Sequence, residues 1–112
     1  MKAWLIDDLK SGIGQLRLGT VMDPEPAAGE VVVRVRYAAL NPADYYLAAG
    51  QYPAKPPTPH VLGRDAVGEV VEVGPDVHDL KPGDRVLLLR SEVGVSRPGT
   101  FAERVVIPVA SL

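Results

Sequence analysis

Cysteine is absent from this sequence of 112 residues, and that absence removes several functions at once. A protein without cysteine has no disulfide framework, no thiol nucleophile and no zinc site built on thiolates. The redox compartment stays undetermined, because no cysteine pattern reports on it. Disulfide-stabilised scaffolds and thiol enzymes are therefore excluded.

Long hydrophobic runs and an excess of one charge are missing as well. The apolar runs are only a few residues long, so the sequence predicts neither a signal peptide nor a membrane span. We therefore expect a cytoplasmic protein. A formal net charge of -2 gives no electrostatic footprint for DNA, RNA or an anionic membrane. Nucleic acid and membranes are accordingly not predicted as partners.

Aromatic residues make up only 5% of the chain, whereas glycine and proline each occur 11 times. Frequent glycine and proline exclude long helices and coiled coils, and the valine-rich apolar fraction favours strands. With 46% hydrophobic and 23% charged residues, a chain of this length can bury one core. We predict a single domain over residues 1–112.

Short strands separated by turns account for most of the pattern. They are predicted at Lys2 to Ile6, Leu16 to Met22, Glu30 to Leu40, Ala66 to Val73, Arg85 to Leu89 and Phe101 to Ile107. In Ala66 to Val73, the alternation puts Val67 on one face and Gly68 on the other, where a small residue indicates close backbone approach. Lys81-Pro82-Gly83-Asp84 predicts a type II turn. The fold class is mainly β, a barrel or a sandwich. The predicted core is Leu5, Val33, Val35, Leu40, Val67, Val71, Val73, Val86, Leu88 and Val106.

One segment breaks the strand pattern. Asn41 is a capping residue, Pro42 occupies the first helical position, Asp44 lies in the first turn and Gly50 is a stop signal. This predicts a helix of about two turns near Asn41 to Ala49. A proline-rich loop follows from Gln51 to Pro59.

Several motif searches give negative results. Gly12 to Arg17 resembles a phosphate loop but has arginine in place of its last glycine and no helix pattern after it, so it predicts a hairpin turn. His60 and His78 stand alone, without metal-ligand spacing, and are interpreted as surface or loop residues. No serine lies in a nucleophile elbow, which excludes that class of hydrolase.

Polar and phenolic groups do gather at the helix start and in the loop after it. The candidates for a functional site are Asn41, Asp44, Tyr45, Tyr46 and Tyr52. A structural interpretation stays open for each, because Asn41 can cap the helix, Asp44 can stabilise its dipole and the tyrosines can cover the core. For Arg64 and Asp65, a structural ion pair is the alternative.

Six motifs in one order give the chain a family resemblance. They are Asn41-Pro-Ala-Asp44, Gly50-Gln-Tyr52-Pro53, Pro59-x-x-x-Gly63-Arg64-Asp65-x-x-Gly68, Val70-Val-Glu-Val-Gly74, Lys81-Pro-Gly-Asp-Arg-Val86 and Gly99-Thr-Phe-Ala-Glu103. Together they resemble the N-terminal GroES-like domain of medium-chain dehydrogenases/reductases, in particular the zinc-independent quinone oxidoreductase or zeta-crystallin-like branch. The resemblance implies a partly open antiparallel β-barrel with one or two short helices.

The resemblance also implies which cofactors to expect. In the zinc enzymes of this family, the positions of Asn41, Arg64 and Asp65 belong to the metal site, and a guanidinium offers no lone pair to a cation. The loop from Arg90 to Pro98 lacks the cysteines of a structural zinc lobe. No zinc is therefore expected. The implied activity is hydride transfer from NADPH to a quinone or an α,β-unsaturated carbonyl.

In such enzymes a separate Rossmann domain binds the dinucleotide, and no such domain is present in these 112 residues. We therefore expect a fragment that is inactive by itself. The implied catalytic residues are Asn41, Asp44, Tyr46, Tyr52 and Arg64, with Asn41 and Tyr46 able to reach the nicotinamide ribose. Arg64 is expected to anchor Asp44 or Asp65, or to offer a fixed positive charge to a developing oxyanion.

Two further expectations concern partners. The segments 41–52 and the C-terminal strand after Phe101 are predicted to expose an apolar patch, which commonly drives self-association into a homo-oligomer. The alternative function is a small β-barrel used as a binding or assembly module, as in co-chaperonins. Such a module needs a long mobile loop with an apolar tip, and residues 23–26 are short and acidic instead.

Overall fold

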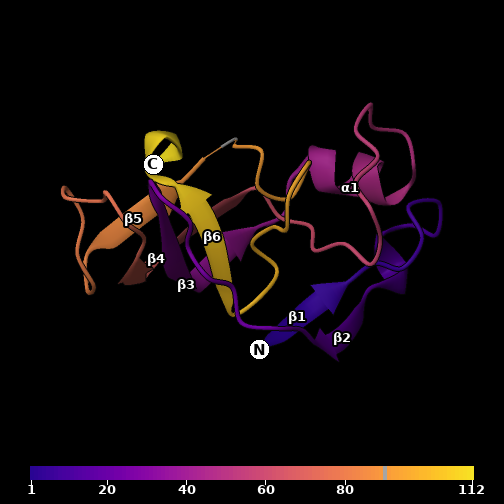
Figure 1. Cartoon of the computed structure of the whole chain (residues 1–112). Coiled ribbons are helices and arrows are strands. Elements are labelled where there is room, and N and C mark those ends of the chain that lie inside the picture. Colours follow the sequence, from indigo (N-terminus) through magenta and orange to yellow (C-terminus); the bar gives the residue numbers. More distant parts are fainter. Residues whose placement is uncertain (90) are drawn as a thin grey trace.

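Two antiparallel β-sheets form the framework of the computed structural model, which describes residues 1–89 and 91–112 (Figure 1). The larger sheet has the order β5-β4-β3-β6, and the smaller one pairs β1 with β2. The strands are β1 (Lys2–Leu5), β2 (Arg17–Thr20), β3 (Glu30–Ala39), β4 (Asp65–Val73), β5 (Arg85–Leu88) and β6 (Arg104–Pro108). One α-helix, α1 (Pro42–Ala48), and two short 3-10 turns at Ile13–Gln15 and Val109–Ser111 complete the elements. No helix in the described part of the chain is long and apolar enough to cross a membrane.

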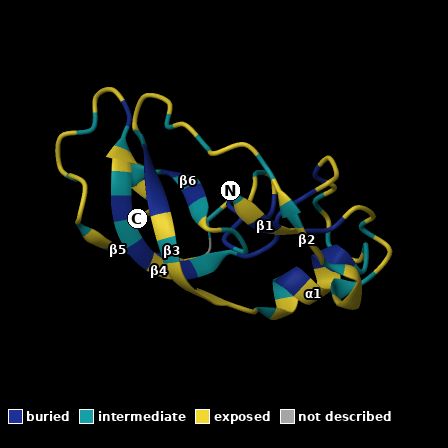
Figure 2. Cartoon of the chain, turned by 90° about the horizontal axis from the view of Figure 1, so that it is seen from below, coloured by how far each residue is buried: buried dark blue, intermediate teal, exposed yellow. Residues whose placement is uncertain are grey.

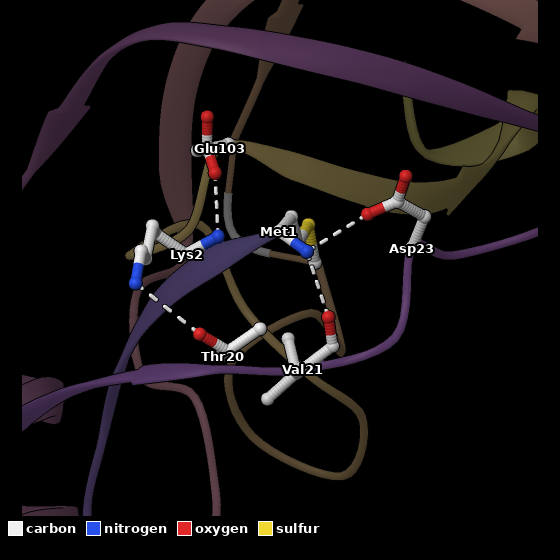
Figure 3. Close-up of polar contacts among 6 residues, drawn as sticks. All are labelled: Met1, Lys2, Thr20, Val21, Asp23 and Glu103. Atoms are coloured by element: carbon white, nitrogen blue, oxygen red, sulfur yellow. Dashed lines mark hydrogen bonds and ion pairs between the residues drawn. The ribbon is translucent and has the colours of Figure 1, made fainter.

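Only isolated bridges and side-chain contacts join the two sheets. Ala3 bridges to Ala102 and Ile6 to His60, so β1 lies against the segments that lead into β6 and β4. Figure 3 shows the N-terminal contacts, in which the Met1 amino group donates to the Val21 carbonyl at 2.7 Å and to Asp23 at 2.9 Å. The sheet does not close into a barrel. The predicted mainly β, partly open antiparallel fold is confirmed.

Three clusters of buried side chains form the core. The largest lies between the strands of the larger sheet and the loop after β5, the second beneath α1, and the third beside β1. Of the predicted core residues, Leu5, Val33 and Leu88 are buried, and Val35, Val71, Val73, Val86 and Val106 are partly buried. Two predictions were wrong, because Leu40 is 71% exposed and Val67 is exposed as well.

The wrong prediction for Val67 follows from the orientation of β4. Its inward residues are Ala66, Gly68 and Val70, so Val67 points outward. Gly68 faces inward where β3 comes close, since a Cβ atom there would lie 2.1 Å from the Arg34 carbonyl oxygen. The close backbone approach inferred from this glycine is confirmed, but the assignment of Val67 to the core was wrong. Leu40 follows the end of β3 and has no neighbouring strand to cover it.

Turns and loops follow the predictions with one exception. The Asp84 amide donates to the Lys81 carbonyl at 3.1 Å, as the predicted turn requires. The glycine-rich segment becomes the connection between β1 and β2 and contains the 3-10 turn, not an α-helix. His78 is exposed, but His60 is buried, and its Nε2 lies 3.0 Å from the Gly94 carbonyl. Of the two interpretations of His60, the loop position is confirmed and the surface position was wrong, because the bridge to Ile6 draws this loop residue into the core.

Burial of His60 predicts a specific acid sensitivity. Burial lowers the pKa of His60 from 6.5, and neither the Gly94 carbonyl nor the charge of Asp44, which act in the opposite direction, overcomes this effect. The unfolded chain therefore binds a proton first as the pH falls below 6.5, and stability present above that pH is lost below it, by up to about 1.4 kcal/mol per pH unit. Urea unfolding of the wild type between pH 7 and pH 5 measures this slope.

Two glutamine variants separate this effect from general acid sensitivity. His60→Gln removes the slope below pH 6.5, whereas His78→Gln, at an exposed position, retains it. A wild-type slope that survives His60→Gln would contradict the assignment.

Candidate active site

A buried carboxylate organises the start of α1. Asp44 is only 1% exposed, and its Oδ2 accepts the Asn41 backbone N–H at 2.9 Å. Its Oδ1 accepts the backbone N–H of Gly63 at 3.0 Å, so one side chain ties the helix start to a distant loop. Burial raises the pKa of Asp44 above its usual range, although both backbone hydrogen bonds act to lower it. The nearby charges of Asp65 and Arg64 have smaller and opposite effects on that pKa.

The loop that carries Arg64 packs directly against the backbone of another loop. The Thr100 amide donates to the Gly63 carbonyl at 3.0 Å, and the Gly99 amide donates to Val61 at 2.8 Å. Gly94 approaches so closely that a Cβ atom on it would lie 2.1 Å from the Gly63 carbonyl oxygen. These contacts leave room only for backbone, and they fix the segment around Ser91 relative to Arg64.

The Arg64 guanidinium is held by neutral oxygen atoms. Nη2 donates to the Ser91 carbonyl at 3.0 Å, and Nη1 donates to the Tyr52 hydroxyl at 3.3 Å. The expected ion pair of Arg64 with Asp44 or Asp65 is wrong, since no such pair forms within the described residues. Asp44 is already committed to two backbone amides, and Asp65 accepts from Asn41. The positive charge of Arg64 is therefore fixed in position without a carboxylate directly on it.

A pocket opens beside this arginine. It has a volume of about 370 Å³ and is lined by Asn41, Pro42, Ala43, Arg64 and Asp65. The Asn41 side-chain amide donates to Asp65 Oδ2 at 2.8 Å across it. The pocket thus combines a fixed cation, an amide and a carboxylate at the junction of β3, α1 and β4.

The remaining predicted residues lie outside the lining of this pocket. Asp44 is buried and does not line the pocket. It positions Asn41 and Gly63 by accepting their backbone N–H groups. Tyr52 is half-buried against the cluster beneath α1 and reaches the site through Arg64. Tyr46 is exposed and packs edge-to-face on Tyr45, with ring centroids 5.5 Å apart and planes at 83°. Figure 2 shows exposed and buried residues on different sides of α1.

Two groups at this site could not be predicted from the sequence, the Ser91 carbonyl and the Thr100 hydroxyl. The Ser91 carbonyl is a backbone atom, and any residue type offers the same acceptor. Thr100 is buried, and its hydroxyl has no partner among the described residues, nor has the buried Nε of Arg64. A loop-to-loop contact between positions this far apart in sequence leaves no spacing pattern to find.

Comparison with known proteins gives a family match. The alcohol dehydrogenase GroES-like domain family matches residues 27–112. An acryloyl-coenzyme A reductase from Metallosphaera sedula is 44% identical over 89 residues, which cover 80% of this chain and 26% of that protein. A chloroplastic NADPH-dependent alkenal/one oxidoreductase from Arabidopsis thaliana is 40% identical over 103 residues, covering 90% of this chain and 26% of the relative. The chain thus spans about a quarter of the length of these curated relatives.

Solved structures agree on the fold. A cobalt- and zinc-bound thermostable alcohol dehydrogenase from Pyrobaculum aerophilum superposes with a TM-score of 0.84 at 30% identity, over 99% of this chain and 40% of that one. This chain therefore shares its architecture with a metal-bound dehydrogenase. The cobalt and zinc belong to the Pyrobaculum aerophilum enzyme.

The double acceptor role of Asp44 predicts a large stability effect. In Asp44→Ala the backbone N–H groups of Asn41 and Gly63 lose their acceptor inside the protein, which we expect to cost about 2–4 kcal/mol of unfolding free energy. Asp8→Ala is the matched control, because this exposed carboxylate also accepts a backbone N–H, from Lys10. Urea denaturation measures both variants. An equal, small loss in the two would contradict the role given to Asp44.

Proposed function

This chain belongs to the alcohol dehydrogenase GroES-like domain family, and we propose that it is the substrate-side domain of an NADPH-dependent, zinc-independent oxidoreductase. The proposed substrates are quinones or α,β-unsaturated carbonyl compounds. The names of two relatives, an acryloyl-coenzyme A reductase and an alkenal/one oxidoreductase, support an activated double bond as the acceptor. The observation that carries the proposal is the fixed Arg64 guanidinium beside Asn41 in the pocket.

Hydride addition to an enone is favoured by a positive charge near the carbonyl oxygen of the substrate. When a hydride adds to the carbon–carbon double bond of an enone, the electron pair moves to the carbonyl oxygen, and a proton completes the reduction later. A preorganised cation near that oxygen stabilises the transition state. Arg64 supplies one, since Ser91 and Tyr52 hold it without neutralising it. The side-chain amide of Asn41 is the second polar group of the pocket and can orient the same oxygen.

The donor set supports a reaction without zinc. No group of three His, Cys, Asp or Glu side chains gathers among the described residues. Arg64 cannot act as a ligand because it has no free lone pair, and Asn41 offers only a neutral amide oxygen, which is a weak ligand for zinc. These residues do not fit a zinc ion, so no step of the proposed mechanism uses one. In the proposed site, the arginine has the electrostatic role of a Lewis acid.

The dinucleotide needs a partner domain. The only phosphate-loop lookalike forms a 3-10 turn between β1 and β2, with no helix whose N-terminus could hold a pyrophosphate. In the proposed enzyme a Rossmann domain of the same full-length protein binds NADPH, which supplies the hydride. The exposed rings of Tyr45 and Tyr46 then lie on the side of this domain that faces the cofactor, and Tyr46 and Asn41 are the groups proposed to reach the nicotinamide ribose.

Removing the charge tests the role of Arg64. In the full-length enzyme, Arg64→Ala is expected to lower kcat about a hundredfold while NADPH affinity stays nearly unchanged, because the charge acts in the transition state. Arg17→Ala removes an exposed arginine that pairs with Asp7 on the other sheet and is the control. Steady-state kinetics with an alkenone and calorimetric NADPH binding measure the two quantities. Lost stability with an unchanged kcat would return Arg64 to a structural role.

The isolated chain tests whether NADPH binding requires the proposed Rossmann domain. Hydride transfer needs nicotinamide and substrate within about 3 to 3.5 Å of each other, held between two walls, and this chain provides one. Titration of NADPH into the 112-residue protein by calorimetry is expected to show no binding in the micromolar range. Micromolar or tighter binding would mean that the cofactor site is already present in this domain.

A further inference from the structure

The buried imidazole of His60 contacts the loop that holds Arg64, and the reaction proposed above does not use it. Its Nε2 lies 3.0 Å from the Gly94 carbonyl oxygen, and the residue is only 3% exposed. A carbonyl oxygen accepts and does not donate, so Nε2 carries the proton of this hydrogen bond. We call residues 91–97 the guanidinium loop, because its Ser91 carbonyl accepts from Arg64.

The guanidinium loop is tied together by its own hydrogen bonds. The Gly94 amide donates to the Arg97 carbonyl at 2.8 Å, and the Val93 amide donates to the Ser91 hydroxyl at 3.2 Å. Val93 also forms a β-bridge with Arg97 and is buried in the largest core cluster. Because these bonds connect the centre of the loop with both of its ends, a displacement at Gly94 also moves the Ser91 carbonyl.

His60 and Arg64 hold the guanidinium loop from one and the same segment. The backbone of His60 is anchored to β1, since its amide and its carbonyl each bond with Ile6 at 2.9 Å. The imidazole therefore starts from a fixed position when it reaches Gly94. Arg64 reaches the same loop at the Ser91 carbonyl, 3.0 Å away. The guanidinium thus keeps its place only while the other attachment point, at Gly94, keeps the loop in register.

The loop has a second side-chain anchor, an ion pair with β3. Arg97 donates to Glu30 at 2.8 Å, and both side chains are partly exposed. A partly exposed ion pair contributes little to stability. The bond of His60 is buried, and its loss leaves the Gly94 carbonyl inside the protein without this donor, which is costly. His60 is therefore the side chain whose removal is expected to disturb the Ser91 carbonyl most.

We propose that His60 is a positioning residue for Arg64. Through the Gly94 carbonyl its imidazole fixes the guanidinium loop, and the Ser91 carbonyl of that loop fixes the cation of the pocket. His60 does not line the pocket, so it acts on the reaction through Arg64. The catalytic part of this inference rests on the function proposed above, in which the charge of Arg64 acts on the substrate.

Side-chain NMR of the 112-residue protein tests the positioning without any reaction. Hydrogen exchange of the Arg64 guanidinium protons reports whether Nη2 keeps its bond to the Ser91 carbonyl. In His60→Leu, which replaces the donor by an apolar side chain, this exchange is expected to rise about tenfold or more. In His60→Gln, which keeps an N–H donor, it is expected to stay near the wild-type value. The Arg17 guanidinium, paired with Asp7, is the internal control and is expected not to change.

Kinetics of the full-length enzyme test the consequence for the reaction. His60→Leu is expected to lower kcat about tenfold, less than Arg64→Ala, while NADPH affinity stays nearly unchanged. In the Arg64→Ala background, the same substitution is expected to have no further effect on kcat, because it acts through the guanidinium. Val105→Ala, in the core beneath β6, is the control for lost stability and is expected to retain kcat. Thermal unfolding confirms that each variant is folded at the assay temperature.

Two results would overturn the proposal. They are unchanged Arg64 exchange in folded His60→Leu, and an equal loss of kcat with and without the Arg64 side chain. If His60→Leu does not fold, His60→Asn takes its place, because its shorter amide stays polar but does not reach Gly94. An unchanged kcat in Arg64→Ala would refute the function proposed for the pocket, whereas the exchange measurement decides on the role of His60 independently of it.

Discussion

The carboxylate of Asp44 is the interaction on which the geometry of the pocket depends. It joins the start of α1 to Gly63, which lies one residue before Arg64 and two before the first residue of β4. Helix, strand end and loop therefore keep one relative position, and Asn41 comes within hydrogen-bonding distance of Asp65. A buried carboxylate is expensive to desolvate, and the raised pKa of Asp44 shows that burial outweighs the two backbone hydrogen bonds. The carboxylate that carries this desolvation cost lies at the junction of β3, α1 and β4, where its two hydrogen bonds hold the segments together.

The second constraint is the close contact between loops on the other side of Arg64. Gly63, Gly94 and Gly99 meet backbone to backbone, so side chains are excluded from the space behind the pocket. This contact brings the Ser91 carbonyl to the guanidinium and holds the charge in place. An arginine restrained by neutral acceptors keeps its full charge for a substrate, which an arginine neutralised by a carboxylate does not. Rigid backbone packing thus holds this residue in the position that its proposed electrostatic function requires.

The two faces of the larger sheet differ in burial. The inner face contributes Val31, Val33 and Val70 to the main core cluster, and the outer face leaves an apolar row uncovered. Exposed tyrosines on α1 and the exposed Leu40 add to the uncovered surface near the pocket. The predicted contribution of the C-terminal strand to such a patch was wrong, because Val105 and Ile107 of β6 are buried. The uncovered surfaces therefore concentrate on α1 and on the outer side of β3, β4 and β5.

The sequence by itself determined the elements and their order. Alternation located β3, the Asn41 to Gly50 signals located α1, and Lys81 to Asp84 located the turn before β5, because each of these rests on local rules of backbone conformation. The six motifs in register were enough to indicate the family that the comparison then confirmed.

Only the tertiary structure decided which side of each strand is buried and which partners the polar groups choose. The inward Gly68 reversed the face assigned to Val67, since register depends on how closely β3 and β4 approach. His60 became a core residue through a bridge to Ile6. Arg64 donates to Ser91 and Tyr52 and not to Asp44 or Asp65, the carboxylates expected as its partners. Each of these outcomes depends on contacts between segments far apart in the chain, and such contacts leave no local pattern in the sequence.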